Sequence, residues 1–150
     1  MQTARMGAYI DAPIERVWEI LIDYPGYARI PGVQMSRMLE HGREHPMGVG
    51  AVRELRVAGT TFAEEILEFE PPRRLAYRII RSRPLRIDHE MGRVELISRG
   101  SGTEVKWSTT FRLAIPLIGD ALSRPLRVLM QHNFNEMLLW LKDDLERRSR

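Results

Sequence analysis

The spacing of apolar residues changes twice along the chain, and this pattern limits the folds that the chain can adopt. Residues 14–21 carry apolar side chains at helical spacing, whereas the stretch from Met35 to Leu113 alternates apolar with polar residues. Helical spacing returns in the last 35 residues. Because a period of two is typical of strands with one buried face, the pattern predicts short helices, a large sheet and a final long helix.

The first helical segment stops abruptly. Its apolar stripe consists of Ile14, Val17, Trp18 and Leu21, and Asp11 is the expected N-cap of the helix. Tyr24-Pro25-Gly26 ends this helix, a second short helix is expected at residues 27–30, and Pro31-Gly32 ends that one. Two short helices with a forced corner between them need something to wrap around, so we expect the corner to wall one end of a cavity.

Seven strands are expected, and short turns separate most of them. The first precedes the helical corner, and the other six follow it; they are Thr3–Ile10, Met35–Glu40, Ala51–Val57, Thr60–Phe69, Leu75–Arg81, Asp88–Ser98 and Thr103–Leu113. Gly or Pro occurs in the turns between the later strands. Short connections favour an antiparallel meander, which curls as it twists.

The final helix is amphipathic. It is expected to begin near Asp120 to Ser123, where either residue could act as N-cap, and its apolar stripe consists of Leu126, Met130, Phe134, Met137, Leu141 and Leu145. A long helix laid into a curled sheet is gripped by it. The sequence therefore predicts one α+β domain over residues 1–150: a helix-grip fold of about seven antiparallel strands around the C-terminal helix, with two short helices after the first strand.

Composition excludes several classes of function. Without cysteine the chain has no disulfide, thiolate nucleophile or cysteine metal site, which fits a reducing compartment. No apolar run approaches the length of a membrane span, so we expect a cytoplasmic protein with no stable membrane insertion.

The net charge of +3 comes from 23 basic and 20 acidic residues. The densest basic run, Tyr77 to Arg86, lacks the interleaved aromatic residues of a nucleic-acid platform; we interpret it as a solvated strand face, with an anionic partner as the alternative, and expect no nucleic-acid partner.

Three stretches resemble a known superfamily: APIERVWEILIDYPGYARIPGV (residues 12–33), FEPPRRLAYRI (residues 69–79) and GSGTEVKW (residues 100–107). They are similar to the START-related, Bet v 1-like (SRPBCC) superfamily, in its bacterial polyketide cyclase/dehydrase and lipid-transport branch, and the resemblance covers nearly the whole chain. It implies a helix-grip fold around an apolar cavity that holds a hydrophobic or amphipathic small molecule. The lining of that cavity differs from member to member.

A two-residue hairpin at Ala58-Gly59 would fix which side chains face the cavity. It sets Arg53 opposite Glu64 on the inner face. The next hairpin would turn Arg78 and Ser82 outward. In the later strands, the alternate residues that carry the apolar side chains should face inward, as should the apolar stripe of the final helix. The expected ligand-binding residues are therefore Arg53, Leu55, Phe62, Glu64, Tyr77, Ile79, Trp107, Thr109, Phe111, Met130, Phe134 and Met137. For the apolar members, plain packing and ligand contact both remain open.

Arg53 and Glu64 carry the sharpest hypothesis, because charged groups on an inner face are costly unless they are paired. The two could form a structural pair. They could also anchor a carbonyl, carboxylate or hydroxyl of a ligand, and Tyr77 could join them through its hydroxyl.

Three functions follow from these residues. The leading one is a non-enzymatic carrier or sensor of an apolar molecule, with no cofactor. The alternative is an aromatase/cyclase or dehydrase-type enzyme, in which Arg53 polarises a carbonyl, Glu64 acts as base and Tyr77 as acid. The stretch DYPGYARIPG, residues 23–32, is also similar to coenzyme Q-binding members of the superfamily, which suggests a chaperone for a polyprenyl quinone.

The histidines do not predict a metal site. His41 and His45 have the spacing of an inverted zinc-protease motif, but that motif needs a helix, and Gly42 and Pro46 favour a loop. His89 and His132 stand alone in the sequence, so structural or solvent-exposed roles are expected for them. No metal is expected.

Overall fold

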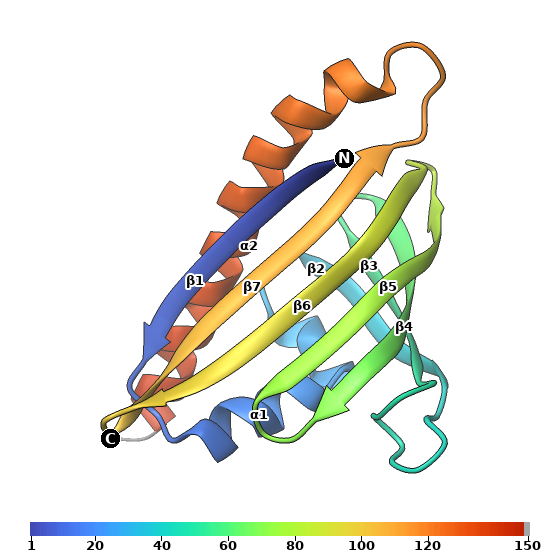
Figure 1. Cartoon of the computed structure of the whole chain (residues 1–150). Coiled ribbons are helices and arrows are strands. Elements are labelled where there is room, and N and C mark those ends of the chain that lie inside the picture. The colour runs from blue at the N-terminus through green and yellow to red at the C-terminus, as the bar shows by residue number, and fades with distance from the viewer. Residues whose placement is uncertain (149–150) are drawn as a thin grey trace.

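A curved antiparallel sheet forms the body of the computed structural model, which describes residues 1–148. Its strands lie in the spatial order β1-β7-β6-β5-β4-β3-β2, as Figure 1 shows. Their bounds are β1 (Gln2–Ile10), β2 (Val33–Glu40), β3 (Val52–Val57), β4 (Thr60–Glu70), β5 (Arg74–Arg83), β6 (Ile87–Arg99) and β7 (Gly102–Leu113). The predicted meander is confirmed, and β1 extends it by pairing with β7.

Three helical segments complete the fold. The helix α1 (Ile14–Ile22) and the 3-10 helix η1 (Pro25–Arg29) follow β1, and α2 (Gly119–Arg148) ends the described chain. Figure 1 shows α2 running behind the sheet beside β1 and β7, with α1 at one end. The predicted helix-grip α+β fold is therefore confirmed, including the second short helix. Among the described residues, no helix is long and apolar enough to span a membrane.

Neither α1 nor α2 has the N-cap that the sequence suggested. Asp11 is not the N-cap of α1, because the helix starts after Pro13 and the Asp11 carboxylate instead accepts a 3.1 Å hydrogen bond from the Ser101 hydroxyl. The long helix starts at Gly119, so neither Asp120 nor Ser123 caps it.

Packing against β7 determines the start of α2. A Cβ atom at Gly119 would lie 2.3 Å from the carbonyl oxygen of Leu113, so only glycine permits this approach. Ser123 is buried inside the helix, where its Oγ donates to the Gly119 carbonyl over 2.6 Å and accepts a bond from the Leu113 amide. The serine thus ties α2 to β7.

The hairpin between β3 and β4 has the predicted register. Ala58 and Gly59 both have positive φ, as a type I′ two-residue turn requires, and Arg53 pairs with Glu64 as expected. The next ladder departs from the prediction. A register shift after Ala63 sets Ser82 opposite Phe62. Because paired residues point to the same face of a sheet, Ser82 shares the inner face with Phe62 and does not face outward as predicted.

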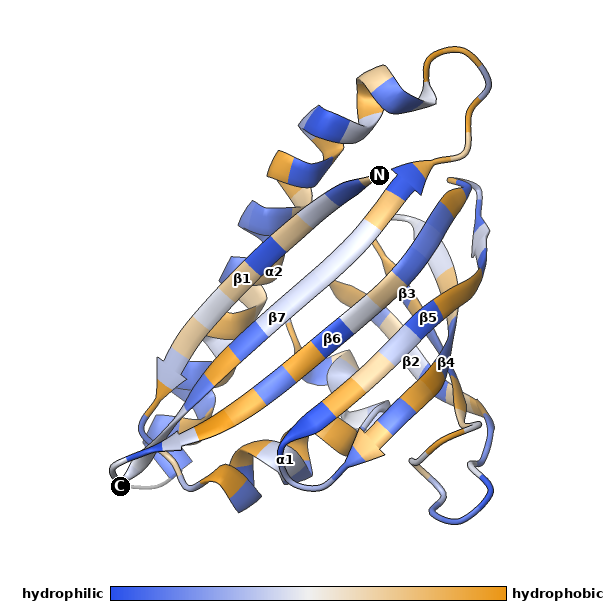
Figure 2. Ribbon diagram, viewed as in Figure 1, coloured by the Kyte–Doolittle hydropathy of each residue, from blue (hydrophilic) through white to orange (hydrophobic). Residues whose placement is uncertain are grey.

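The core lies between the concave face of the sheet and the helices. Alternation along β7 is as predicted, with Val105, Thr109 and Phe111 buried and Lys106 and Arg112 exposed. Figure 2 shows the same alternation of hydropathy along the strands. The large side chains that are fully buried are Ile10, Tyr24, Ile66, Leu75, Phe111 and Leu145. Of the predicted stripe on α2, Leu145 is fully buried, and the other five residues are half-buried.

Candidate ligand cavity

An apolar cavity of about 110 Å³ lies between α2, the inner face of the sheet and the helical corner. Aliphatic side chains from both sheet and helices form most of its wall. The lining residues are Val17, Ile20, Leu21, Tyr27, Arg53, Leu75, Tyr77, Val94, Leu96, Val105, Trp107, Leu138 and Leu141. Because α1 and η1 contribute four of them, the helical corner walls the cavity as its sequence suggested.

Arg53 supplies the charged part of this wall. Its side chain is only 5% exposed, and its Nε donates a 3.0 Å hydrogen bond to Oε1 of Glu64. The guanidinium carbon lies 4.7 Å from the ring centroid of Tyr24, 5.5 Å from that of Tyr27 and 4.8 Å from that of Tyr77. Cation–π contacts with this tyrosine cage, Tyr24, Tyr27 and Tyr77, replace part of the solvation that burial removes.

The hydroxyl groups of the tyrosine cage have partners of their own. Tyr24 donates to the carbonyl of Met47 over 2.6 Å, and Tyr27 donates to the carbonyl of Leu21. The Tyr77 hydroxyl accepts a 2.9 Å bond from Nε1 of Trp107, so its own proton remains free to donate. The cage therefore joins the helical corner, β5 and β7 around one guanidinium.

Burial sets the protonation of this cluster. It raises the pKa of all three cage tyrosines above 10, so their phenols are neutral at physiological pH. Burial also raises the pKa of Glu64, against the opposing charge and hydrogen bond of Arg53. Burial, the largest single effect, lowers the pKa of Arg53, but the charge of Glu64 and the smaller effects of the three tyrosines together outweigh it, and the guanidinium stays protonated. The cavity wall therefore offers a fixed cation at Arg53 and, at Tyr77, a neutral hydroxyl that can donate.

His89 packs against the tyrosine cage and holds Tyr77 in place. Its ring stacks on Tyr77, with centroids 5.6 Å apart. Nδ1 accepts a 2.9 Å bond from the Ile79 amide, so Nε2 carries the proton and donates to the Thr109 hydroxyl over 2.7 Å. Burial, with a smaller contribution from the charge of Arg78, lowers the pKa of His89 to about 4. The residue is thus a neutral, structural histidine, in the role that its sequence context predicted.

Gly92 makes room for the ring of Tyr77. A Cβ atom at this position would lie 2.1 Å from Cζ of Tyr77 and 2.5 Å from its hydroxyl oxygen. The two residues are paired across β5 and β6. Because Gly92 has no side chain, the Tyr77 ring packs closely against the backbone of β6, and this contact fixes the position of the Tyr77 hydroxyl at the cavity wall.

The predicted site residues fall into three groups. Arg53, Tyr77 and Trp107 line the cavity. Four others contact that group or its supports: Glu64 bonds to Arg53, Phe134 stacks on Trp107 at 4.5 Å, and Thr109 and Ile79 bond to His89. The remainder lie outside the lining, with Leu55 and Phe111 buried and Phe62, Met130 and Met137 half-buried.

Sequence reasoning missed part of the cavity. It omitted Tyr24 and Tyr27 from the site, although both belong to the helical corner that it expected to be a wall. It also omitted Leu138, which is 6% exposed and next to the predicted position Met137. The predicted helical corner could have identified the two tyrosines as part of the wall. Leu138 could not be identified in this way, because the rotation of α2 about its axis depends on packing that the period of apolar residues does not resolve.

The described residues hold no candidate metal centre, since no three His, Cys, Asp or Glu side chains among residues 1–148 are grouped to hold an ion. His41 and His45 lie in the loop between β2 and β3, as expected. Nδ1 of His45 accepts a bond from the Met47 amide within that loop.

Comparison with known proteins identifies relatives by family and by fold. Residues 1–146 match the family model described as polyketide cyclase / dehydrase and lipid transport. Among solved structures, the protein TTHA0849 from Thermus thermophilus has a TM-score of 0.79 at 24% identity, covering 99% of this chain and 100% of that one. The Zhui aromatase/cyclase from Streptomyces sp. R1128 has a TM-score of 0.78 at 24% identity, with coverages of 99% and 96%.

A START superfamily protein from Mycobacterium smegmatis is similar in structure but more distant in sequence. Its TM-score is 0.80 at 12% identity, and the match covers 97% of each chain. At these identities the likeness shows a shared fold. No curated protein sequence matches the chain.

Proposed function

The chain belongs to the polyketide cyclase/dehydrase and lipid transport family, and we propose that it binds a hydrophobic or amphipathic small molecule as a carrier or sensor. The observation that carries this proposal is the apolar cavity with one charged wall. Aliphatic residues surround the apolar body of the ligand, and Arg53 faces its polar group. A carbonyl, carboxylate or hydroxyl oxygen is the group that a buried guanidinium would bind.

The size of the cavity limits what enters without rearrangement. Its volume of about 110 Å³ is close to that of engineered cavities that hold one benzene ring, at about 150 Å³, and below the ~300 Å³ of common ligand pockets. A single ring or a short chain segment would fit the closed form. A larger ligand requires α2 to move away from the sheet, and the half-buried stripe on that helix would then supply further contacts.

Extraction followed by mass spectrometry tests the proposal. The purified protein would be denatured in organic solvent, and the extract compared with that of the Leu138→Trp variant, whose indole would fill the cavity. We expect an apolar compound in the wild-type extract alone. Equal amounts in both extracts would place the compound outside the cavity and contradict the proposal. The mass also decides whether the ligand is a lipid, a polyketide-like compound or a polyprenyl quinone.

A cyclase or dehydrase-type enzyme is the second candidate, and the juxtaposition of Arg53 with the neutral phenols of Tyr27 and Tyr77 favours it. The guanidinium would polarise a carbonyl, and Tyr77 would donate a proton. Glu64, with its raised pKa, would act as base once Arg53 moved to admit it. The Tyr77→Phe variant separates the candidates, because an enzyme would keep binding and lose turnover, whereas a carrier returns its ligand unchanged.

A further inference from the structure

Apolar side chains are exposed at the end of the molecule where β7 leads into α2. Leu117 is completely exposed, Ile118 is 53% exposed and Leu122 is 42% exposed. Figure 2 shows this loop as an orange, hydrophobic segment that extends beyond the sheet, and Figure 1 places it at the start of α2. Three neighbouring apolar side chains in water form the kind of patch that marks an interaction site.

The backbone of Leu117 makes this exposure more informative. Its φ of 72° lies in the left-handed region, which a bulky residue rarely adopts and which glycine adopts freely. Folding alone would favour glycine here, because the leucine side chain strains the backbone and buries no surface. The residue at this position therefore indicates a role for an apolar side chain outside the folded chain.

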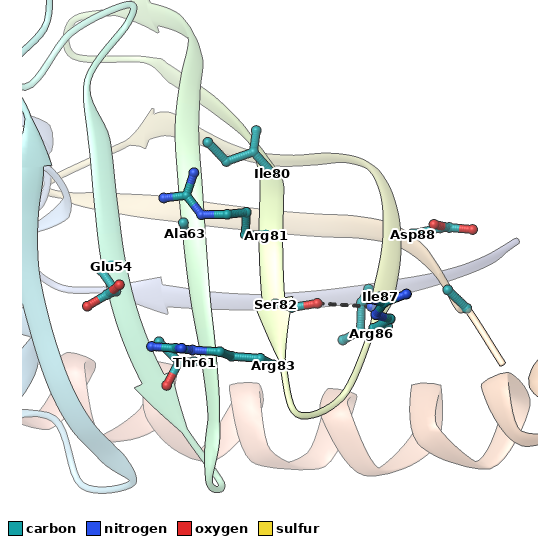
Figure 3. A pocket seen from close by; sticks show the side chains of 11 residues that line it. Glu54, Thr61, Ala63, Ile80, Arg81, Ser82, Arg83, Arg86, Ile87 and Asp88 are labelled. Atoms are coloured by element: carbon teal, nitrogen blue, oxygen red, sulfur yellow. Dashed lines mark hydrogen bonds between the residues drawn. The ribbon is translucent and has the colours of Figure 1, made fainter.

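A basic basin adjoins the apolar loop. On the outer face of the sheet, a hollow of about 650 Å³ is lined by Arg81, Arg83 and Arg86 among others. Figure 3 shows the side chains of Arg81 and Arg83 both extending from β5 towards β4, with Arg86 in the turn just before β6.

The charge of this basin is not neutralised from within. Its two acidic residues are already paired, Glu54 with Arg37 at 2.8 Å and Asp88 with Arg112 at 2.6 Å. Among residues 1–148, no carboxylate forms an ion pair with Arg81, Arg83 or Arg86. Three cationic side chains are therefore available to an anionic partner.

The apolar loop and the basic basin share one end of the molecule. Asp88 and Ala114 line the basin and also a neighbouring hollow of about 390 Å³ that Leu117 lines. The Ala114 amide donates a 3.0 Å bond to the carbonyl of Arg86, which joins the two loops. We call this combined surface, Arg81, Arg83, Arg86, Leu117, Ile118 and Leu122, the docking end.

We propose that the docking end binds the surface of a bilayer that contains anionic lipids. The three apolar side chains would enter the interfacial region, and the arginines would contact lipid phosphates. A bilayer suits this geometry because it accepts a protruding apolar loop without a shaped groove, whereas an acidic protein would need a complementary apolar pocket. This attachment is peripheral, and it does not depend on what the cavity binds.

Vesicle flotation tests the proposal directly. The full chain would be mixed with vesicles of pure phosphatidylcholine or of phosphatidylcholine with 30% phosphatidylglycerol, at low and high salt. We expect binding to the anionic vesicles and little to the neutral ones. The double variant Arg81→Gln/Arg83→Gln should weaken binding by roughly 25-fold, since each basic residue near such a surface contributes about fivefold. The control Arg16→Gln/Arg73→Gln removes two exposed arginines, one in α1 and one in the β4–β5 turn, and should bind like wild type.

Leu117→Gly tests the apolar half of the docking end. Thermal stability should be unchanged or higher because the backbone strain is relieved, while vesicle binding falls severalfold. The control Leu139→Ser, at a position on α2 that is 49% exposed, should not affect binding. Three results would overturn the proposal: no binding to anionic vesicles, equal binding by wild type and both docking-end variants, or equally effective competition by soluble glycerol phosphate at the same headgroup concentration.

Discussion

Arg53 and Glu64 form an ion pair inside the protein, with Nε of the guanidinium 3.0 Å from Oε1 of the carboxylate and side chains only 5% and 12% exposed. Removing one partner of such a pair leaves an uncompensated buried charge. Glu64→Leu should therefore destabilise the protein by about 3 to 5 kcal/mol, measured by urea unfolding.

The double variant Arg53→Met/Glu64→Leu is the matched control for this pair. It removes both charges at similar volume, so it should recover much of the stability that the single variant loses. If Glu64→Leu alone is harmless, the buried pair does not contribute as we describe. Loss of ligand binding in a stable double variant would make Arg53 the polar anchor of the cavity.

Gly92→Ala should displace the ring of Tyr77, because the added Cβ would lie 2.1 Å from Cζ. Overpacking of this kind costs about 1 to 3 kcal/mol. In a Tyr77→Ala background the same substitution should cost little, since the ring it meets is absent. An equal cost in both backgrounds, measured as a double-mutant cycle, would contradict the contact.

Acid should destabilise the protein through His89. Its folded-state pKa of about 4 lies below its ordinary value of 6.5. Below pH 6.5 the unfolded chain gains a proton that the folded protein does not bind, so the stabilisation is complete above pH 6.5. It is lost as the pH falls towards 4, by up to about 3 kcal/mol.

The His89→Gln variant isolates this effect. It removes the titrating ring, so its free energy of unfolding should fall less steeply between pH 6.5 and 4 than that of the wild type. Parallel curves for the two proteins over this range would show that burial does not hold His89 neutral.

Phe134→Ala should weaken ligand binding more than folding. The Phe134 ring stacks on Trp107 at 4.5 Å but is only half-buried, so the stability cost should fall below the ~3 to 5 kcal/mol of a fully packed ring. Loss of the stack frees the Trp107 indole at the cavity wall, and its fluorescence should shift. A mild loss of stability with unchanged ligand affinity would remove Phe134 from any role beside the cavity.

The sequence predicted the architecture because each element carries its own periodic pattern. The alternation along β7 identified its inner face, and Ala58-Gly59 identified the hairpin that pairs Arg53 with Glu64. Prediction was wrong where tertiary packing decides. The way α2 begins, without Asp120 or Ser123 as its N-cap, depends on the approach of Gly119 to β7, and the orientation of Ser82 depends on a register shift in the β4–β5 ladder.

The site was less predictable than the fold. The alternation of residues along the strands predicted that Tyr77 and Trp107 face inward. The sequence does not specify that three tyrosines from different parts of the fold converge on one guanidinium. That convergence follows from how the helical corner packs on the sheet. The ligand-binding role of the predicted residues and the cytoplasmic location both stay predictions.

Titration with a naphthalene dye that carries a carbonyl group tests most directly whether an apolar ligand occupies the cavity between the sheet and α2. Leu138 lines the cavity, whereas its neighbour Leu139 is 49% exposed, so Leu138→Trp and Leu139→Trp form a matched pair. We predict saturable binding by the wild type and by Leu139→Trp, and at least tenfold weaker binding by Leu138→Trp. Equal binding by all three proteins, or no saturable binding by the wild type, would contradict the account.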